Sequence, residues 1–482
     1  MFNLLRQQPR AFHMIFMLEI WERFGFYTVQ GILVLYFIRF LGFSETTAYY
    51  TFGAFSALVY SMVAVGGYLG DRVIGTKRTL VLGMLTLALG YLALALATKE
   101  FVFYALGCIC VGNGLFKANP ASLLSKCYDD NDPRLHGGFT LYYMAVNVGA
   151  IAALFVGPTL SSRFGYPYAY LVSFVGLLLG LANYIFQRQH ISQINNSADS
   201  RKISVFHWML ITAGIAAAIV ISAHLLQHVM IAKNLVWIIT ICVIGIYFFY
   251  MFKETGATFT RMLLAFVLMI EAVAFFTLYQ QMPTSLNLFA VNNVEPLLFG
   301  IHIDSQSFQA LNPLWIVMMS PLLVMLYSKL HLRGLSFPIP YKFAMGMTCC
   351  GLSFIVLFFA RFIHTEAGVV SSGWLIASYF FQSIGELLVS ALGVAMVAEL
   401  VPQPIVGFVM GMWFLSSALA GFLGARVASY TELPHTIKPG VESLMIYTNV
   451  FVKIGVVTLI IALLLWLISP RLTRLMGEQS TI

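Results

Sequence analysis

Charged residues inside apolar stretches are the first candidates for chemistry in this 482-residue chain. Glu19, Glu22 and Arg23 lie within one apolar run, and spacings of three and four residues put Glu19 on the same helical face as the other two. Two carboxylates beside one guanidinium are not expected to stay doubly ionised away from water, so one should be able to take up a proton. The spacing predicts a proton-handling cluster; the alternative is a structural ion pair that anchors the helix.

Three further charged residues, Lys117, Glu271 and Glu386, also lie inside apolar stretches. A charged side chain at the middle of a bilayer costs at least about 2.5–3.5 kcal/mol, so such residues usually face protein or water and have a function. Lys117 is expected to need a carboxylate partner or a bound anion, unless it extends to the membrane surface. Glu386 is suited to binding an ammonium group, whereas a packing role and a proton site are equally open for Glu271.

Motifs for other chemistries are weak in this sequence. Residues 70–77 resemble a phosphate-binding loop only superficially, because the order is Gly-Thr-Lys rather than Gly-Lys-Ser/Thr. The sequence contains no HExxH or GxSxG motif. His224 and His228 share a helix face without an evident third ligand, and none of the six cysteines forms a CxxC pair. The sequence therefore favours neither ATP hydrolysis nor a metal site.

The composition indicates which elements must position the charged residues. Hydrophobic residues make up 60% of the chain and charged residues 10%, whereas soluble globular chains have about 45–50% and about 25%. We therefore expect an all-α integral membrane protein, since backbone in lipid must satisfy its own hydrogen bonds. Fourteen segments have the length and apolarity of a membrane span, near residues 12–38, 48–70, 78–97, 101–125, 137–160, 166–187, 207–226, 232–252, 261–290, 306–330, 341–362, 372–400, 404–430 and 446–469.

A polar stretch after residue 187 divides these segments into six, two and six. The predicted organisation is a six-helix bundle over 1–190, a linker with two extra transmembrane helices over 191–256, and a second six-helix bundle over 257–482. Lys and Arg are more frequent in the loops on the side of the N-terminus, which predicts that both termini are cytoplasmic. Two six-helix halves fit a secondary transporter, although composition alone also allows a channel or a membrane-embedded enzyme.

Several segments of the chain resemble the proton-dependent oligopeptide transporters, a branch of the major facilitator superfamily. The residues Glu19-x-x-Glu22-Arg23 resemble the ExxER motif of that family, residues 66–75 resemble its loop between the second and third helices, and residues 139–149 resemble its fifth-helix signature. The resemblance extends from the first helix to the eleventh and is nearest to bacterial members that carry dipeptides and tripeptides. It implies the major facilitator fold, with two extra central helices.

The resemblance also implies roles for individual residues. Glu19, Glu22 and Arg23 resemble the proton-coupling cluster, with Lys117 as its basic partner. Glu271, a mid-span acid that the resemblance does not assign, is an additional candidate for proton coupling. The residues that resemble the site for the peptide's carboxylate end are Lys117, Arg23, Tyr27 and Tyr60. The residues that resemble the site for its amino end are Asn147, Asn312 and Glu386, with Trp413 as a pocket wall and Ser390 as a further candidate.

Two neutral residues depart from the pattern of many family members. Gln30 stands where many members have Arg, and Gln280 stands where many have Glu. In such members the two charges are thought to pair as an outer gate. Here a glutamine–glutamine hydrogen bond could close the gate; the alternative is that proton coupling relies on the first-helix cluster, with or without Glu271.

The resemblance implies proton-coupled symport of dipeptides and tripeptides into the cytoplasm by alternating access, across a bacterial inner membrane. The expected partners are the peptide and the bilayer, with no nucleic acid, no cofactor besides protons, and a monomer as the functional unit. The alternative is a proton-coupled carrier of another small solute such as nitrate, although an acidic Glu386 disfavours a bare anion. A channel or an intramembrane enzyme is less favoured, since no nucleophile or metal set is visible.

Overall fold

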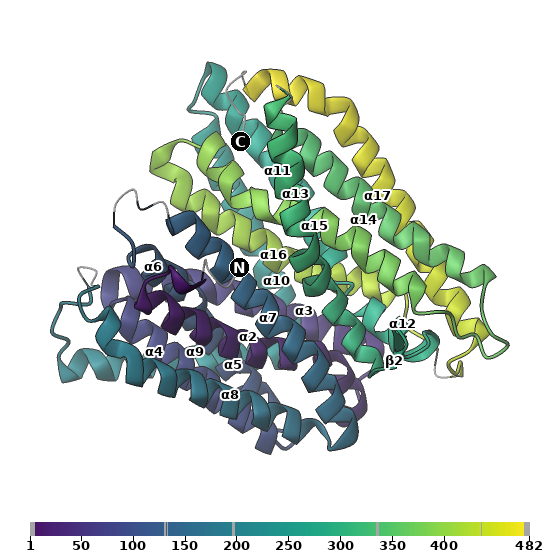
Figure 1. The fold of residues 1–482 in the computed structure, drawn as a ribbon, viewed down its shortest axis with the longest axis horizontal. Coiled ribbons are helices and arrows are strands. Elements are labelled where there is room, and N and C mark those ends of the chain that lie inside the picture. Colours follow the sequence, from purple (N-terminus) through teal and green to yellow (C-terminus); the bar gives the residue numbers. More distant parts are fainter. Residues whose placement is uncertain are drawn as a thin grey trace. The chain divides into compact units, whose positions relative to one another are not determined.

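A computed structural model describes residues 5–129, 132, 134–194, 198–333, 337–434 and 436–476, and its regular structure is almost entirely α-helical (Figure 1). The elements up to residue 227 are α2 (Arg10–Tyr36), η1 (Phe37–Leu41), α3 (Glu45–Tyr68), η2 (Leu69–Val73), α4 (Thr76–Leu96), α5 (Val102–Lys117), α6 (Asn119–Ser125), α7 (Arg134–Arg163), α8 (Tyr166–Gln187), η3 (Arg188–Ile191) and α9 (Val205–Gln227). The elements that follow are α10 (Val229–Met251), α11 (Gly256–Tyr279), α12 (Ser285–Asn293), β1 (Leu297–Leu298), β2 (Ile301–His302), η4 (Ser305–Ala310), α13 (Leu311–Leu332), α14 (Ile339–Phe359), η5 (Ala360–Phe362), α15 (Gly373–Leu400), η6 (Gln403–Ile405), α16 (Val406–Ser429) and α17 (Val441–Met476).

Twelve helices in the described part of the chain are long and apolar enough to cross a membrane, compared with the fourteen spans expected from the sequence. The span expected near 101–125 is interrupted, because α5 has 16 residues and ends at Lys117, and α6 begins after it with Pro120 in its first turn. Proline is tolerated at a helix start, where its missing N–H would have no helical partner. The span expected near 372–400 corresponds to the 28-residue α15, whose side chains are described only in part.

The chain divides into two compact units. The first unit comprises residues 1–42 and 54–232, and the second comprises residues 43–53 and 233–482. Helix α9 therefore belongs to the first unit and α10 from Lys233 onward to the second, so the division falls inside the predicted linker. The six-two-six organisation of the sequence stays a prediction.

In the first unit, α2 packs against α7 and α8, and α4 packs against α5 and α8 (Figure 1). Helices α3 and α5 approach closely, because a Cβ atom at Gly66 would collide with the backbone of Gly114. Small residues allow transmembrane helices to come this near to each other, and the association then relies on van der Waals packing. This contact fixes how residues of α3 and α5 face one another.

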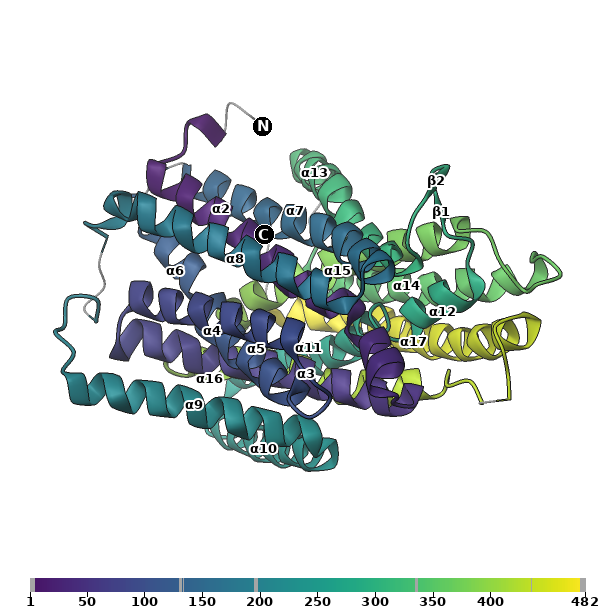
Figure 2. The ribbon, with the colours of Figure 1, turned by 90° about the horizontal axis from the view of Figure 1, so that it is seen from below.

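In the second unit, α14 packs against α15 and α17, and α11 packs against α16. Aromatic rings fill the space beside α17, where Phe289 and Phe354 both contact Phe451 at centroid distances of 5.4 and 5.9 Å. The Phe289–Phe451 pair is edge-to-face, an arrangement that stabilises a core beyond its buried area. The short β1–β2 hairpin lies next to α12 at the edge of this unit (Figure 2).

Candidate functional site

The charged cluster of α2 forms as the helical spacing predicted. Arg23 Nε lies 3.2 Å from Glu19 Oε1, and the same guanidinium contacts Glu22. All three residues are buried, with Glu22 completely so. One guanidinium therefore serves two carboxylates inside the first unit.

Two neutral side chains from other helices complete this cluster. Asn113 of α5 donates its amide to Glu22 Oε1 at 3.1 Å, and Tyr142 of α7 donates its hydroxyl to Glu19 Oε2 at 2.7 Å. Both bonds stabilise a carboxylate in its ionised form. Asn113 and Tyr142 are additions to the predicted site, and both are polar residues inside predicted spans, at 101–125 and 137–160.

Lys117 is the last residue of α5, and its ammonium lies against an aromatic ring rather than beside the carboxylate partner that its charge suggested. Its ammonium lies 4.3 Å from the centroid of the Tyr60 ring, an arrangement in which the ring face attracts a cation. Among the described residues it makes no ion pair with a carboxylate, and it interacts with Glu22 and Glu19 only at longer range. Lys117 and Tyr60 thus form one cationic site beside the α2 cluster.

Glu386 of α15 has amide and hydroxyl neighbours in the second unit. Asn312 at the start of α13 donates to Glu386 Oε2 at 2.7 Å and also lies 3.1 Å from the hydroxyl of Ser383. Ser383 in turn donates to the backbone carbonyl of Asn312 at 3.3 Å. Within the described residues, no basic side chain forms an ion pair with Glu386. The carboxylate is therefore oriented by neutral groups.

Glu271 of α11 is almost completely buried, with 3% of its surface exposed. Neither carboxylate oxygen has a hydrogen-bond partner among the described residues. An ionised carboxylate without a partner is costly to bury. The position agrees with a proton site and equally with an uncharged packing role, so both interpretations of Glu271 stay open.

The remaining predicted residues are distributed over both units. The Asn147 amide donates to the backbone carbonyl of Tyr143 in its own helix, at 2.9 Å. Trp413 is buried and packs edge-to-face against Phe276, with ring centroids 5.7 Å apart. The buried Gln280 packs against the backbone position of Gly424. The residues Tyr27, Gln30 and Ser390 are half-buried. Gln30 and Gln280 belong to different units, so the predicted gate between them stays a prediction.

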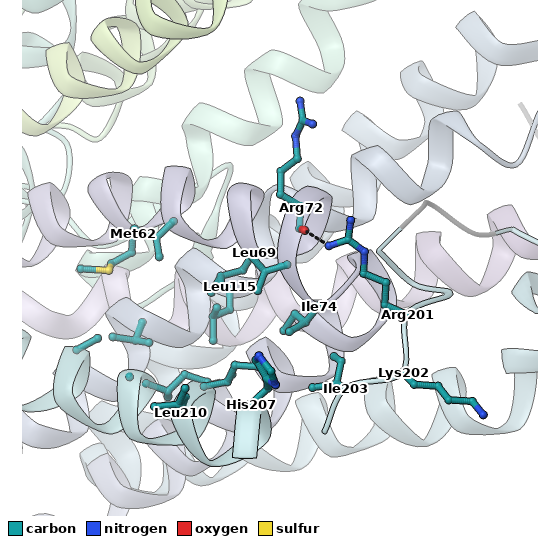
Figure 3. Close-up of a pocket in the computed structure, with 17 residues that line it drawn as sticks. Met62, Leu69, Arg72, Ile74, Leu115, Arg201, Lys202, Ile203, His207 and Leu210 are labelled. Carbon is teal, nitrogen blue, oxygen red and sulfur yellow. Dashed lines mark hydrogen bonds between the residues drawn. The ribbon is translucent and has the colours of Figure 1, made fainter. Parts of the chain in front are cut away.

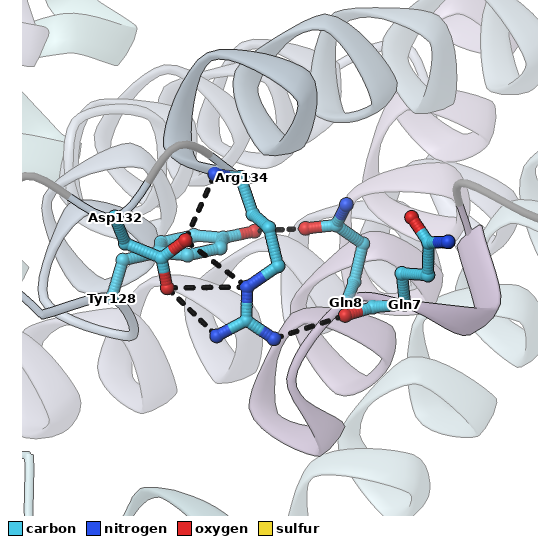
Figure 4. Close-up of polar contacts among 5 residues, drawn as sticks. All are labelled: Gln7, Gln8, Tyr128, Asp132 and Arg134. Carbon is cyan, nitrogen blue, oxygen red and sulfur yellow. Dashed lines mark hydrogen bonds and ion pairs between the residues drawn. The ribbon is translucent and has the colours of Figure 1, made fainter.

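A second polar cluster ties the N-terminal segment to the start of α7 (Figure 4). Arg134 makes an ion pair with Asp132 at 2.7 Å and donates to the backbone carbonyl of Gln7 at 3.1 Å. Hydrogen bonding from the guanidinium lowers the pKa of the Asp132 carboxyl below its usual range. Tyr128 donates to Gln8 at 2.7 Å, and burial raises the pKa of that phenol to about 12.

Metal binding has no support in the part of the chain that the structure describes. No group of three or more His, Cys, Asp or Glu residues there is arranged to hold a metal ion. The rings of His224 and His228 lie 4.4 Å apart, as their spacing predicted. Without a third ligand, these two histidines do not form a metal site.

Comparison with known proteins identifies the class of this two-unit membrane protein. A family model described as the POT family matches residues 77–446. The chain is 47% identical to dipeptide and tripeptide permease B of Photorhabdus asymbiotica, over 98% of each chain. It is 48% identical to the permease B of Edwardsiella piscicida, over 99% of this chain and 98% of that one. A crystal structure of tetrameric PepTSo2 matches with a TM-score of 0.87 and 34% identity, over 96% of this chain and 99% of that one.

The fold is therefore that of a multi-pass membrane transporter of the major facilitator type. The chain belongs to the POT family, the proton-dependent oligopeptide transporters. This membership confirms the resemblance drawn from the ExxER motif and the fifth-helix segment, and it confirms a transporter rather than an enzyme.

Proposed function

We propose that this chain couples the inward movement of protons to the uptake of dipeptides and tripeptides by alternating access. The observation that carries the proposal is the buried cluster in which Glu19 and Glu22 share the guanidinium of Arg23. A cluster of two acids and one base changes its internal pairing when a proton neutralises one acid. The relatives are named dipeptide and tripeptide permeases, which supports peptides as the substrate.

Proton uptake on Glu22 or Glu19 is the proposed coupling step. Protonation removes one of the two negative charges that Arg23 balances, so the guanidinium loses part of its ionic pairing within α2 and is available to an anion. Glu271, which has no hydrogen-bond partner among the described residues, is the proposed second proton carrier. We propose no cofactor besides the coupling proton.

Recognition of the peptide is proposed to use its two charged ends. The carboxylate end would bind the basic and aromatic groups of the first unit, which are Arg23, Lys117, Tyr27 and Tyr60. The amino end would bind Asn147, Asn312 and Glu386, with Trp413 as a pocket wall and Ser390 as a further candidate. The Glu386 carboxylate has only neutral partners in the described chain, which leaves its charge for an ammonium group. Recognition of the ends alone would tolerate many side chains.

The proton gradient supplies enough energy for this role. One proton that moves through about 100 mV releases about 2.3 kcal/mol, and one pH unit adds about 1.4 kcal/mol. Together, at one proton per peptide, they would support a concentration ratio of a few hundred-fold.

The protein is proposed to reside in a bacterial inner membrane with both termini in the cytoplasm. The excess of Lys and Arg in the loops of the N-terminal side supports this orientation. A monomer is the proposed functional unit, although the similar PepTSo2 was crystallised as a tetramer. Gln30 and Gln280 are proposed to close the outer gate through a hydrogen bond, without a change of charge.

The test is uptake of radiolabelled alanyl-alanine into proteoliposomes with an imposed inward proton gradient. We expect accumulation above the external concentration, and a protonophore should abolish it. Excess unlabelled tripeptide should compete, whereas nitrate should not. Uptake that is indifferent to the protonophore would contradict coupling, and competition by nitrate would favour the carrier of small anions.

A further inference from the structure

A groove of about 740 Å³ lies in the first unit between α3, α5 and α9, apart from the charged cluster of α2 (Figure 3). Met62 and Leu69 line it from the α3 side, Leu115 lines it from α5, and Leu210 faces them from α9. Its volume falls within the range of about 300–1,000 Å³ that is typical of ligand pockets. Most of its lining is aliphatic, so its occupant must present an apolar body.

One end of the groove is basic. Arg72, Arg201, Lys202 and His207 line it there, with the side chains of Arg72 and Lys202 extending outward from the groove (Figure 3). None of the residues that line the groove, all of which the structure describes, is acidic. Arg201, Lys202 and His207 are exposed. A peptide would leave its ammonium end unpaired in such a groove, whereas an anion attached to an apolar chain matches both of its ends.

The basic end is held in place by contacts with the α3–α4 connection. Arg201 Nη1 donates to the backbone carbonyl of Arg72 at 3.4 Å, and Arg78 donates to the carbonyl of Arg201 at 2.9 Å. The backbone N–H of Lys77 donates to Asp199 at 3.2 Å. Gly75 has a φ of 94° and lies against Asp199, so only glycine fits there. The segment that precedes α9 is therefore fixed beside the groove.

Helix α9 presents mostly exposed apolar residues, and only 17% of its most apolar part is buried. In a membrane protein this surface is in contact with lipid. The groove beneath α9 is thus open to molecules of the bilayer. Basic pockets between transmembrane helices recognise anionic lipid headgroups.

We propose that this groove binds one anionic phospholipid from the leaflet on the side of Arg201. An acyl chain lies between α9 and the pair α3 and α5, and the phosphate lies at Arg201 and Lys202. The bound lipid fills the space between α9 and the remainder of the first unit. This site does not depend on the proposed peptide transport.

The charge of the site is tested with purified protein and phosphatidylglycerol in detergent, by native mass spectrometry. Each cation near a membrane surface contributes about fivefold in affinity for an anionic lipid, so Arg201→Gln/Lys202→Gln should weaken phosphatidylglycerol binding by about 25-fold. The matched control is Lys253→Gln/Arg261→Gln, which removes two exposed charges of the second unit outside the groove. Phosphatidylcholine should bind all three proteins weakly. Equal losses in the two double variants would overturn the proposal.

The apolar part of the site is tested by filling it. A Cβ atom at Gly214, which lines the groove, meets nothing within 4 Å, and the same is true of Gly245 in α10, which does not line it. Gly214→Leu should therefore reduce phosphatidylglycerol binding at least tenfold, and Gly245→Leu should leave it unchanged. Both variants should keep the thermal stability of the parent in lipid-free detergent. Unchanged lipid binding in Gly214→Leu would overturn the proposal. If this variant instead changed the oligomeric state while its lipid binding stayed the same, the groove would be a contact with a second copy of the chain, and the proposal would also fail.

Discussion

The two units both bury glutamates in their helices, but they satisfy them in different ways. In the first unit, Arg23 contacts both Glu19 and Glu22, and further donors come from Asn113 and Tyr142. In the second unit, Glu386 receives a hydrogen bond from an amide at 2.7 Å, and both oxygens of Glu271 have no described partner. The same residue type is thus paired with a permanent positive charge in one unit and only with neutral groups, or none, in the other.

This difference indicates that the acids of the first unit respond to protons, whereas Glu386 of the second unit is available to a ligand. Removing one partner of a buried ion pair costs about 3–5 kcal/mol, because the remaining charge is left uncompensated. A proton that neutralises Glu19 or Glu22 therefore has a large effect on what holds Arg23. Glu386 has no internal cation in the described chain, so its charge is available for a ligand. The four predictions below test this contrast.

The largest effect is expected from Glu22→Gln in the first unit. The variant cannot exchange a proton at this position, and Arg23 keeps only Glu19 as its ionic partner. We expect proton-driven accumulation of alanyl-alanine to fall at least 100-fold, while exchange of labelled for unlabelled peptide across the membrane continues. Uptake and counterflow in proteoliposomes measure the two properties separately.

Glu100→Gln is the control for this change, because Glu100 is an exposed residue between α4 and α5 of the same unit. It should transport like the parent. If Glu22→Gln still concentrates peptide against a gradient, the ionic cluster of α2 is not the coupling site.

The second prediction concerns Glu386→Gln, which keeps the shape and removes the charge. A hydrogen bond to a charged group contributes about 1.5–3 kcal/mol, so the KM for a peptide with a free amino group should rise about 10–100-fold. Coupling to protons should persist, unlike in Glu22→Gln. Competition by N-acetylated and free peptides measures the preference for an amino end, which the variant should lose. Glu366→Gln, an exposed residue of the same unit, should behave like the parent; an unchanged preference in Glu386→Gln would place amine recognition elsewhere.

The third prediction compares Leu substitutions at the two glutamates of the second unit. Glu271→Leu removes two oxygens without described hydrogen-bond partners, so we expect the free energy of unfolding to rise by about 1–3 kcal/mol. Glu386→Leu leaves the Asn312 amide without this acceptor and should lower stability by a similar amount. Thermal unfolding in detergent measures both. Equal destabilisation would mean that Glu271 has a partner that the described residues do not include.

The features of the protein that could be predicted from the sequence are those that depend on the length of a helix or on the spacing of residues within one helix. The pairing of Arg23 with Glu19 follows from a separation of four residues on one helix, so it needs no tertiary information. Most spans follow from length and apolarity. Within the fourth expected span, Asn119-Pro120 can break the helix locally, and a separate helix does start there after Lys117. A hydropathy average does not register such a break.

Contacts between helices could not be predicted in the same way. The bonds from Asn113 and Tyr142 depend on how α5 and α7 are placed around α2, and the position of Lys117 over Tyr60 depends on the close approach of α3 and α5 at Gly66. These placements result from packing between segments far apart in the sequence. The sequence does show Asn113 and Tyr142 as polar groups inside apolar spans, but it does not show which carboxylate each one contacts.

The smallest effect is expected at an exposed ion pair, Asp132 with Arg134, which provides a reference for the buried cluster. Surface pairs contribute little because water screens them. Arg134 lowers the pKa of the Asp132 carboxyl in the folded state. The ion pair therefore stabilises the fold fully above a pH of about 3.9, the pKa of an aspartate in the unfolded chain. This stabilisation is lost as the pH falls through the lower pKa of the folded state. Asp132→Asn should speed hydrogen exchange of residues 5–8 no more than a few-fold between pH 5 and 8, with no trend over that range.

The matched control is Tyr128→Phe, which removes the neutral hydrogen bond to Gln8 in the same cluster. Its effect on exchange should also be constant from pH 3 to 8, because the pKa of Tyr128 is raised to about 12. The effect of Asp132→Asn should instead disappear as the pH falls through the lowered pKa of the parent's Asp132 carboxyl. Since both pairs are insensitive to pH between 5 and 8, any change in peptide uptake over that range must come from groups other than Asp132 and Tyr128. If the effect of Asp132→Asn on hydrogen exchange changed with pH above pH 5, the exposed pair would also titrate between pH 5 and 8. The exposed pair and the buried glutamates would then no longer differ in their response to pH.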